Sequence, residues 1–313
     1  MVLAWVVTQA VWAGDPPQPT LFASPTTHDH VGRVVAPVMI NGQGPFRFIV
    51  DTGANQSTIS PRLVQLLGLT PAEATTILVD GITGTAQVAF VTIDRLQAGD
   101  LTIDGSELPV VWAPVMAGAD GILGAAGLGG KSLMIDFQRN RVEIASHVES
   151  LTRAQSIKIH ATRLTYGLVT LDTRVGRVPV LAVVDTGSER TLGNIALRDA
   201  LKAQRTAGAT VQLTSVYGAT AQVEPGELRA APLITIESLR ITDVAIVYGD
   251  FHIFKVWALT DRPAMIIGMD VLGTVGSLSI DFKNQDIYVA NIRHTGDALP
   301  AAHGTLSDMS QKK

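Results

Sequence analysis

The chain of 313 residues contains no cysteine, so it can form neither disulfides nor thiolate metal sites. This absence does not decide the compartment, because disulfide-free proteins occur in both reducing and oxidising surroundings. Charge is scarce as well: 17% of the residues are charged, the formal net charge is −4, and Lys and Arg form no long run. Because a polyanion is held by clustered positive charge, the sequence predicts no nucleic-acid partner.

Long hydrophobic runs are also missing. The apolar stretch MVLAWVVTQAVWA at residues 1–13 is shorter than the roughly 18 residues of a spanning helix, so we predict no membrane span. It is similar to the apolar part and cleavage region of a secretory signal, although a basic leader is missing. We therefore predict a signal remnant and mobile leader at 1–30 and a periplasmic or secreted protein. A buried first strand or a disordered tail is the alternative.

An internal repeat is the main feature that the sequence does contain. Residues 46–60 read FRFIVDTGANQSTIS and residues 180–194 read VLAVVDTGSERTLGN, so in both an apolar run leads into Asp-Thr-Gly. Four further matches follow in the same order: GITGTAQV (81–88) with VYGATAQV (216–223), LTI (101–103) with LRIT (239–242), GILG (121–124) with MIIG (265–268), and LMIDF (133–137) with LSIDF (278–282). Chance does not account for this order, and two copies are too few for a solenoid. The sequence predicts two homologous lobes.

The spacing within the two copies supports this interpretation. A glycine follows each Asp after 33 residues, from 51 to 84 and from 185 to 218. The glycine of the apolar-apolar-Gly turn follows after 73 residues in the first copy (51 to 124) and after 83 in the second (185 to 268).

Short runs rich in Val, Ile, Thr and Leu, bounded by Gly, Asn, Asp or Pro, predict strands and hairpins. In the first copy they lie at 34–41, 46–51, 87–95, 101–103, 108–113, 132–137 and 141–145, with counterparts in the second. Short helices are expected at 61–67, at 195–204, and after Gly124 and Gly268. We predict an N-terminal lobe at 31–147, a linker at 148–160, a C-terminal lobe at 161–294 and a mobile tail at 295–313.

The pairing of Asp-Thr-Gly with a later apolar-apolar-Gly turn in each half resembles the retropepsin and pepsin families of aspartic peptidases. The resemblance covers residues 34–145 and 165–290. It implies an all-β fold of two retropepsin-like β-barrel lobes with a cleft between them, whose Asp-Thr-Gly loops meet at a pseudo-twofold axis. Retroviral members supply one lobe per chain and dimerise. This chain carries both, which implies an active monomer that hydrolyses an extended peptide or protein substrate.

The resemblance assigns catalysis to Asp51 and Asp185. Two carboxylates within hydrogen-bond distance do not both ionise readily, so they share one proton, an effect for which aspartic proteases are the standard example. The ionised partner can take a proton from a water held between them, while the protonated partner hydrogen-bonds the substrate carbonyl. The dyad titrates as a pair. This mechanism requires no metal, cofactor or covalent intermediate.

The neighbours of the two carboxylates are expected to support the catalytic loops. Gly53 and Gly187 permit a tight turn and a close approach without a Cβ. The resemblance assigns Thr52 and Thr186 to hydrogen bonds across the lobe interface. Behind the loops, we expect packing rather than substrate contact from four apolar side chains, Ile122, Leu123, Ile266 and Ile267.

Two segments occupy the place of the flap hairpins: Gly81, Ile82, Thr83 and Gly84 in the first lobe, and Tyr217 and Gly218 in the second. A flap covers the bound peptide, excludes bulk water and donates backbone hydrogen bonds to it. Ordinary turn chemistry is the alternative for a Gly-rich hairpin tip.

One asymmetry separates the two catalytic loops: Ala54 follows the first Asp-Thr-Gly, and Ser188 follows the second. In pepsin-like relatives a hydroxyl at this place hydrogen-bonds the outer oxygen of the neighbouring Asp and favours its ionised form. We therefore predict that the shared proton resides more on Asp51 and that Asp185 is more often ionised. The alternative is that Ser188 faces its own backbone.

Other functions have weaker support. Residues 125–132, AAGLGGKS, fit a relaxed phosphate-loop pattern, but such a loop opens a helix, and the following LMIDFQRNRVEI is typical of two strands. The seven histidines are scattered and predict no metal site. A cleavage-poor peptide-binding or scaffolding protein is the remaining alternative, against which the two intact acids argue. General digestion and strict processing of one partner fit the sequence equally well.

Overall fold

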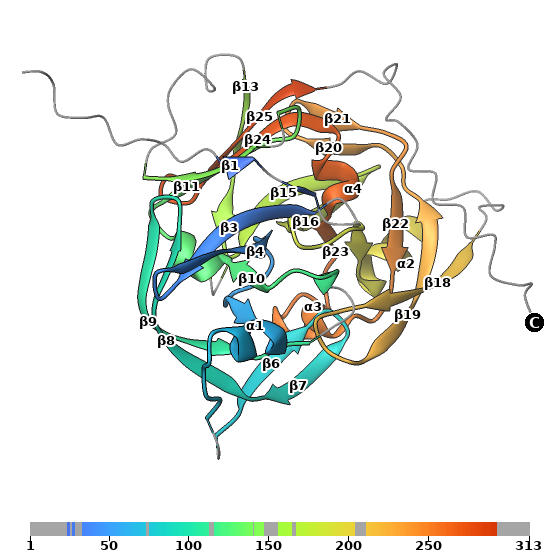
Figure 1. Ribbon diagram of the computed structural model, residues 1–313. Helices are drawn as coiled ribbons and strands as arrows, with labels where there is room; N and C mark the ends of the chain where they lie inside the picture. Colours follow the sequence, from blue (N-terminus) through green and yellow to red (C-terminus); the bar gives the residue numbers. More distant parts are fainter. Residues whose placement is uncertain are drawn as a thin grey trace, which may run out of the picture.

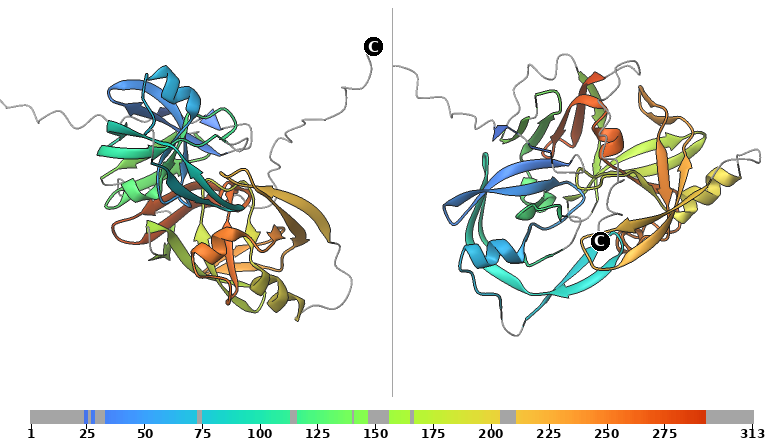
Figure 2. Two further views of the ribbon diagram at one scale, coloured as in Figure 1. Left: turned by 90° about the horizontal axis from the view of Figure 1, so that it is seen from below. Right: turned by 45° about the vertical axis from the view of Figure 1, so that its right-hand side comes forward.

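The computed structural model describes residues 24–25, 27–28, 33–72, 75–112, 116–139, 141–146, 156–164, 167–203 and 211–292. The protein is an all-β molecule of two lobes with a few short helices (Figure 1). Seen from below, the first lobe lies above the second in Figure 2 (left). The predicted signal and tail fall outside these ranges except for two short strands described below, and export stays a prediction.

The first lobe is built on a seven-stranded sheet in the order β5-β10-β4-β3-β8-β9, with β2 paired to β3. Along β8, for example, β-branched and apolar side chains alternate between buried and less buried positions, which is typical of a half-buried strand. A separate hairpin pairs β6 with β7. The strands are β2 (Thr27–His28), β3 (Val34–Ile40), β4 (Gln43–Asp51), β5 (Thr58–Ile59), β6 (Ile77–Gly81), β7 (Gly84–Val88), β8 (Phe90–Ala98), β9 (Leu101–Pro109) and β10 (Gly121–Gly124).

The second lobe is built on a ten-stranded sheet in the order β18-β19-β22-β17-β23-β16-β15-β20-β21, with β14 paired to β15. Its central strands repeat the connections of the first lobe, because β23 lies parallel to β16 as β10 lies parallel to β4. The strands are β14 (Thr162–Arg163), β15 (Val169–Val175), β16 (Val178–Val184), β17 (Leu192–Gly193), β18 (Gln212–Tyr217), β19 (Val223–Ala230), β20 (Ile234–Ile236), β21 (Leu239–Ile241), β22 (Ala245–Tyr248) and β23 (Ala264–Ile267).

A six-stranded sheet joins the two halves in the order β1-β12-β11-β24-β25-β13. The two matching LxIDF segments meet in it, with Leu133 opposite Ile280 and Ile135 opposite Leu278. β1 and β13 come from the predicted leader and the predicted linker, and they pair with β12 and β25. The strands are β1 (Ser24–Pro25), β11 (Ser132–Asp136), β12 (Arg141–Ala145), β13 (Ser156–His160), β24 (Val275–Asp281) and β25 (Asp286–Ile292).

The helices are short, and four of the predicted positions are confirmed. α1 (Pro61–Leu66) begins after Ser60 and α2 (Ile195–Lys202) after Asn194, and each cap side chain accepts a hydrogen bond from the third residue beyond it. The 3₁₀ helix η2 (Ala125–Leu128) and the helix α4 (Met269–Leu272) follow Gly124 and Gly268. A further helix, α3 (His252–Val256), was not predicted.

Two strand predictions need correction. Residues 101–103 and 108–113 were expected as separate strands, but β9 continues from Leu101 to Pro109 because β8 pairs with it over its whole length. The run 87–95 spans the end of β7 and the start of β8. Ser132 opens β11 instead of a helix, so the Gly-Lys-Ser segment lacks the context of a phosphate loop.

A cluster of buried apolar side chains runs through both lobes and includes Val50, Leu123, Val184 and Ile267. These residues lie directly before or beside the Asp-Thr-Gly loops, so the core fixes the strands that carry the loops. In the part of the chain that the structure describes, no helix has the length and apolar character needed to cross a bilayer.

Candidate active site

Each Asp-Thr-Gly loop stands at the end of a buried strand. β4 ends at Asp51, and β10 runs beside it so that Gly124 lies opposite Asp51. β16 ends at Val184, which lies opposite Ile267 of β23, and Asp185 follows. The four side chains expected to pack behind the loops are 0–7% exposed, which places them in the core: Ile122, Leu123, Ile266 and Ile267.

The two threonines bind the loops to each other. The Thr52 hydroxyl donates to the carbonyl oxygen of Val184 at 2.7 Å, and the Thr186 hydroxyl donates to that of Val50 at 2.7 Å. The backbone N–H of each threonine in turn donates to the other hydroxyl, at 3.2 Å for Thr52 and 3.1 Å for Thr186. Both threonines are fully buried. The four bonds cross between the lobes and hold both loops in one symmetrical unit.

Each loop glycine leaves room for the opposite carboxyl group. A Cβ on Gly53 would overlap the carboxyl of Asp185, and one on Gly187 would overlap that of Asp51. Neither glycine has the left-handed backbone that favours this residue. Glycine is therefore needed at these two positions to leave space between the loops, and not for the tight turn that we also expected.

The structure brings Asp51 and Asp185 together, as the resemblance implied. The Oδ1 atom of Asp51 accepts hydrogen bonds from the N–H groups of Gly53 at 2.9 Å and Ala54 at 2.8 Å. The Oδ1 atom of Asp185 accepts from Gly187 at 2.8 Å and Ser188 at 3.1 Å. Asp185 is buried, whereas Asp51 is partly exposed. The pair therefore has matched inner contacts and unequal access to solvent.

The electrostatic environment separates the two carboxyls. Burial raises the pKa of Asp185 well above its ordinary value, and the negative charge of Asp51 raises it further. Burial also raises the pKa of Asp51, but a hydrogen bond with Asp185, the loop N–H groups and the charge of Arg33 oppose this rise. The two carboxyls therefore hold one proton between them, and burial together with the charge of Asp51 favours the protonated form of Asp185.

This assignment reverses the one expected from Ser188. The Ser188 hydroxyl donates to the carbonyl oxygen of Arg190 at 2.8 Å, so its single proton is already engaged with its own backbone. The prediction that the Ser188 hydroxyl favours an ionised Asp185 is wrong, and the alternative, in which Ser188 faces its own backbone, is confirmed. Of Ser188, only the backbone N–H donates to Asp185. The contribution of Arg33, which is 7% exposed, was missed, because an isolated Arg before the first long strand carries no motif.

Two hydroxyl residues behind the loops were also missed. The N–H of Gly124 donates to the Ser57 hydroxyl at 3.1 Å, and the N–H of Gly268 donates to the Thr191 hydroxyl at 3.2 Å. Both hydroxyl residues stand six positions after their Asp, so the repeat itself held the signal. The Thr191 hydroxyl also donates to Asp270 at 2.7 Å. These bonds link each loop to its apolar-apolar-Gly turn.

Both predicted flap segments lie on hairpins, but the two tips differ. Gly81 pairs with Gly84 in the first hairpin, which leaves the two-residue turn Ile82–Thr83. In the second, Tyr217 pairs with Val223 and residues 218–222 form the turn. The repeat aligns Gly84 with Gly218, but the two glycines differ in position. Gly84 opens the returning strand β7, whereas Gly218 opens the turn. Tyr217 is 59% exposed.

The two hairpin tips contact each other. The hydroxyls of Thr83 and Thr220 lie 3.3 Å apart, and both residues are buried. The Gln222 side-chain amide donates to the carbonyl oxygen of Thr85 at 2.8 Å. Sequence reasoning missed Thr220 and Gln222 because it centred the second tip on Tyr217 and Gly218. In Figure 1 the hairpins and the six-stranded sheet lie on opposite sides of the central strands β4 and β16.

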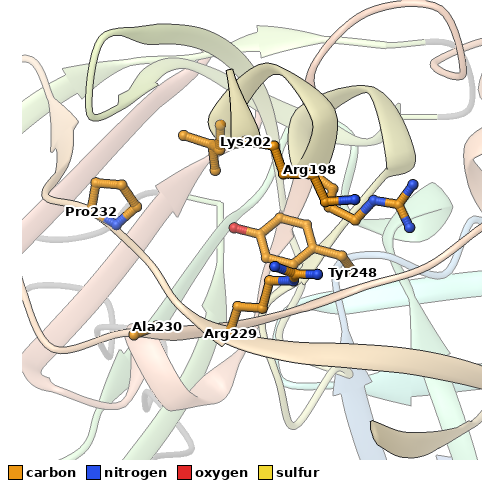
Figure 3. A pocket seen from close by; sticks show the side chains of 7 residues that line it. Arg198, Lys202, Arg229, Ala230, Pro232 and Tyr248 are labelled. Carbon is orange, nitrogen blue, oxygen red and sulfur yellow. The ribbon is translucent and has the colours of Figure 1, made fainter. Parts of the chain in front are cut away.

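Two pockets lie elsewhere in the described structure, and neither is lined by Asp51 or Asp185. A recess of about 10 Å³ lies beside α2, where Arg198 and Arg229 surround Tyr248 (Figure 3). Both arginines form ion pairs with Glu227, and Arg198 also pairs with Asp199, so two carboxylates compensate the two positive charges. A cavity of about 430 Å³ between the ten-stranded sheet and the six-stranded sheet is lined mainly by apolar residues. Within the described ranges, no three His, Asp or Glu side chains are grouped to hold a metal ion.

A comparison with protein-family models identifies a family for this chain. A family model described as "Aspartyl protease" matches residues 36–126 and 169–271, well over half of the chain. The two matched regions contain the two Asp-Thr-Gly loops and both hairpin tips. No curated protein gives a significant sequence match.

Proposed function

The chain belongs to the aspartyl protease family, and we propose that it is a single-chain endopeptidase with Asp51 and Asp185 as its catalytic residues. The observation that carries this proposal is the crossed threonine arrangement, which places two carboxyl groups side by side. A buried like-charge pair is unfavourable unless a proton is shared. Unfavourable ionisable pairs of this kind cluster at catalytic sites, and here four interlobe hydrogen bonds hold the pair in place.

Asp51 acts as the general base and Asp185 as the general acid. The ionised Asp51 takes a proton from a water between the two carboxyls, and the water oxygen forms a bond to the carbonyl carbon of the peptide. Asp185 donates its proton to the carbonyl oxygen, which gives a neutral tetrahedral intermediate. Asp51 then gives its proton to the amide nitrogen as the C–N bond breaks, and Asp185 recovers a proton from one hydroxyl of the intermediate as the carbonyl double bond re-forms. We assign the roles in this order because burial and the charge of Asp51 both raise the pKa of Asp185.

The substrate we propose is an extended peptide. The two hairpins bridge the lobes at their tips, through Thr83 with Thr220 and through Gln222 with Thr85. They must part to admit a chain and close again over it, which excludes bulk water from the carboxyl pair. An extended strand fits because hairpin backbone can bond to it in the manner of an added strand. Since one chain carries both loops, the active unit we propose is a monomer.

Cleavage of a peptide library at several pH values tests the proposal. The native chain should cleave, whereas Asp51→Asn and Asp185→Asn should each lose at least about 100-fold in rate, the lower range of acid–base catalysis. Asp104→Asn is a matched control, because Asp104 lies on the exposed edge of β9 and pairs with Arg95. Library binding without cleavage by the native chain would favour the peptide-binding alternative and contradict the proposal.

A further inference from the structure

The first flap hairpin is attached to the opposite lobe by more than its tip. On β6, the Asp80 carboxylate Oδ1 lies 3.0 Å from Nε2 of His252, the first residue of α3. The next residue of α3 also contacts the flap, because the N–H of Ile253 donates to the carbonyl oxygen of Ile82 at 3.4 Å. α3 packs against both β6 and β7. Polar contacts from two successive helix residues therefore hold one side of the flap.

Apolar packing strengthens the same junction. The Ile82 side chain packs against a cluster of buried residues in the second lobe that includes Phe251, Ile253 and Phe254. Phe254 also contacts Trp257 edge to face, with ring centroids 6.3 Å apart. The flap tip thus covers apolar surface that would otherwise face water.

α3 lies in a segment that is longer in the second copy of the repeat. Ile59 pairs with Val110 and with Gly121, and the equivalent Gly193 pairs with Tyr248 and with Met265. The chain advances 11 positions from Val110 to Gly121 and 17 from Tyr248 to Met265. Six of the ten extra residues of the second copy therefore lie in the segment that contains α3, and the asymmetry of the repeat coincides with the contact to the first flap.

We propose that α3 is a dock for the first flap, with Asp80 and His252 as positioning residues that hold the closed flap against the second lobe. The expected effect of the dock on KM rests on the proposed peptidase function, whereas its expected effect on the order of the flap does not. A two-stranded hairpin is marginally stable alone in water, so β6 and β7 depend on such contacts to remain ordered. The dock favours the closed flap, and substrate entry requires its release.

The kinetic consequence separates KM from kcat. With the dock weakened, the free enzyme opens its flap more readily to an incoming peptide, so KM falls. After binding, the peptide itself pairs with the flap, so the chemical step changes little. For one side-chain hydrogen bond, we expect KM to fall about 2- to 10-fold, with kcat within about twofold of the native value.

Hydrogen exchange measured by mass spectrometry tests the dock without relying on activity. His252→Ala and Asp80→Ala should each speed amide exchange at residues 77–88 by about 2- to 10-fold and leave β11 and β24 unchanged. His252→Gln keeps an N–H donor for Asp80 and should restore slow exchange. His160→Ala is the matched control, because His160 is also bonded to a carboxylate, Glu237 at 3.4 Å, in a pair that does not involve the flap.

The outcomes distinguish the dock from the peptidase function. If exchange at 77–88 stays native in both alanine variants, the dock is wrong even if the protein cleaves peptides. If exchange rises across the whole chain in both, α3 supports folding of the second lobe, and the dock is equally contradicted. A local rise that His252→Gln reverses supports the dock even if the native chain cleaves nothing, a result that would count against the proposed function alone.

Discussion

The Thr52 hydroxyl donates to the carbonyl oxygen of Val184, and the Thr186 hydroxyl donates to that of Val50, both at 2.7 Å. Each acceptor directly precedes the aspartate of the opposite loop. Thr52→Val or Thr186→Val would leave a buried carbonyl oxygen without its donor, which costs about 1–3 kcal/mol. We expect the free energy of unfolding, measured in urea, to fall by this amount and cleavage to fall with it. Thr→Ser at either position keeps the hydroxyl and should stay close to native. A valine variant with native stability and rate would contradict this role.

Ser188 should have little influence on the acidic limb of the pH profile. Its hydroxyl donates to the carbonyl oxygen of Arg190 rather than to either carboxyl of the pair. In Ser188→Ala we therefore expect the acidic limb of kcat/KM to stay in place, with a loss of stability of about 1 kcal/mol from the broken hydrogen bond. A clear shift of that limb toward higher pH would mean that the hydroxyl does act on the dyad.

Arg33 should affect that limb instead. Its positive charge lowers the pKa of Asp51, the proposed base. Arg33→Gln should therefore raise the pKa of Asp51 and move the acidic limb of kcat/KM, which reports the free enzyme, to higher pH. Arg33→Lys keeps the charge and should leave the limb near its native position. Equal profiles for the native chain and the Gln variant would remove Arg33 from the account.

Asp185→Asn should stabilise the fold in a pH-dependent way. Because the folded-state pKa of Asp185 is raised, the folded chain holds this proton more tightly than the unfolded chain. The native carboxyl therefore costs no stability below its unfolded pKa of about 3.9, and the cost grows as the pH rises toward the folded pKa. Asn does not titrate, and it keeps an acceptor for the N–H groups of Gly187 and Ser188.

Urea unfolding at pH 3 and pH 7 checks this prediction. The stability of Asp185→Asn relative to the native chain should be higher at pH 7 than at pH 3. The exposed Asp104→Asn variant should show no such trend. A gain that is equal at both pH values would show that the pKa of Asp185 is not raised.

Local chemistry made part of this architecture predictable from sequence. The caps Ser60 and Asn194 stand nine residues after their aspartates, and each starts a helix where the apolar spacing changes. The Asp-Thr-Gly loops were recognisable because motif, order and duplication agreed. The family match over both regions bears out the recognition.

The features that were missed depend on contacts between distant segments. The flap turns are set by the pairs Gly81 with Gly84 and Tyr217 with Val223, which residue identity alone does not report. The direction of the Ser188 hydroxyl depends on the path of the next two residues. Nothing local to His252 points to Asp80, which lies 172 positions away.

The central claim is that Asp51 and Asp185 of one chain form one catalytic centre. Mixing the two inactive variants, Asp51→Asn and Asp185→Asn, in equal amounts tests it most directly. If both carboxyls must come from the same chain, every molecule in the mixture lacks one, and peptide cleavage should stay as low as with either variant alone. If the centre forms between two chains, mixed pairs regain a complete dyad. Recovery of a substantial fraction of the native rate on mixing would contradict the single-chain account.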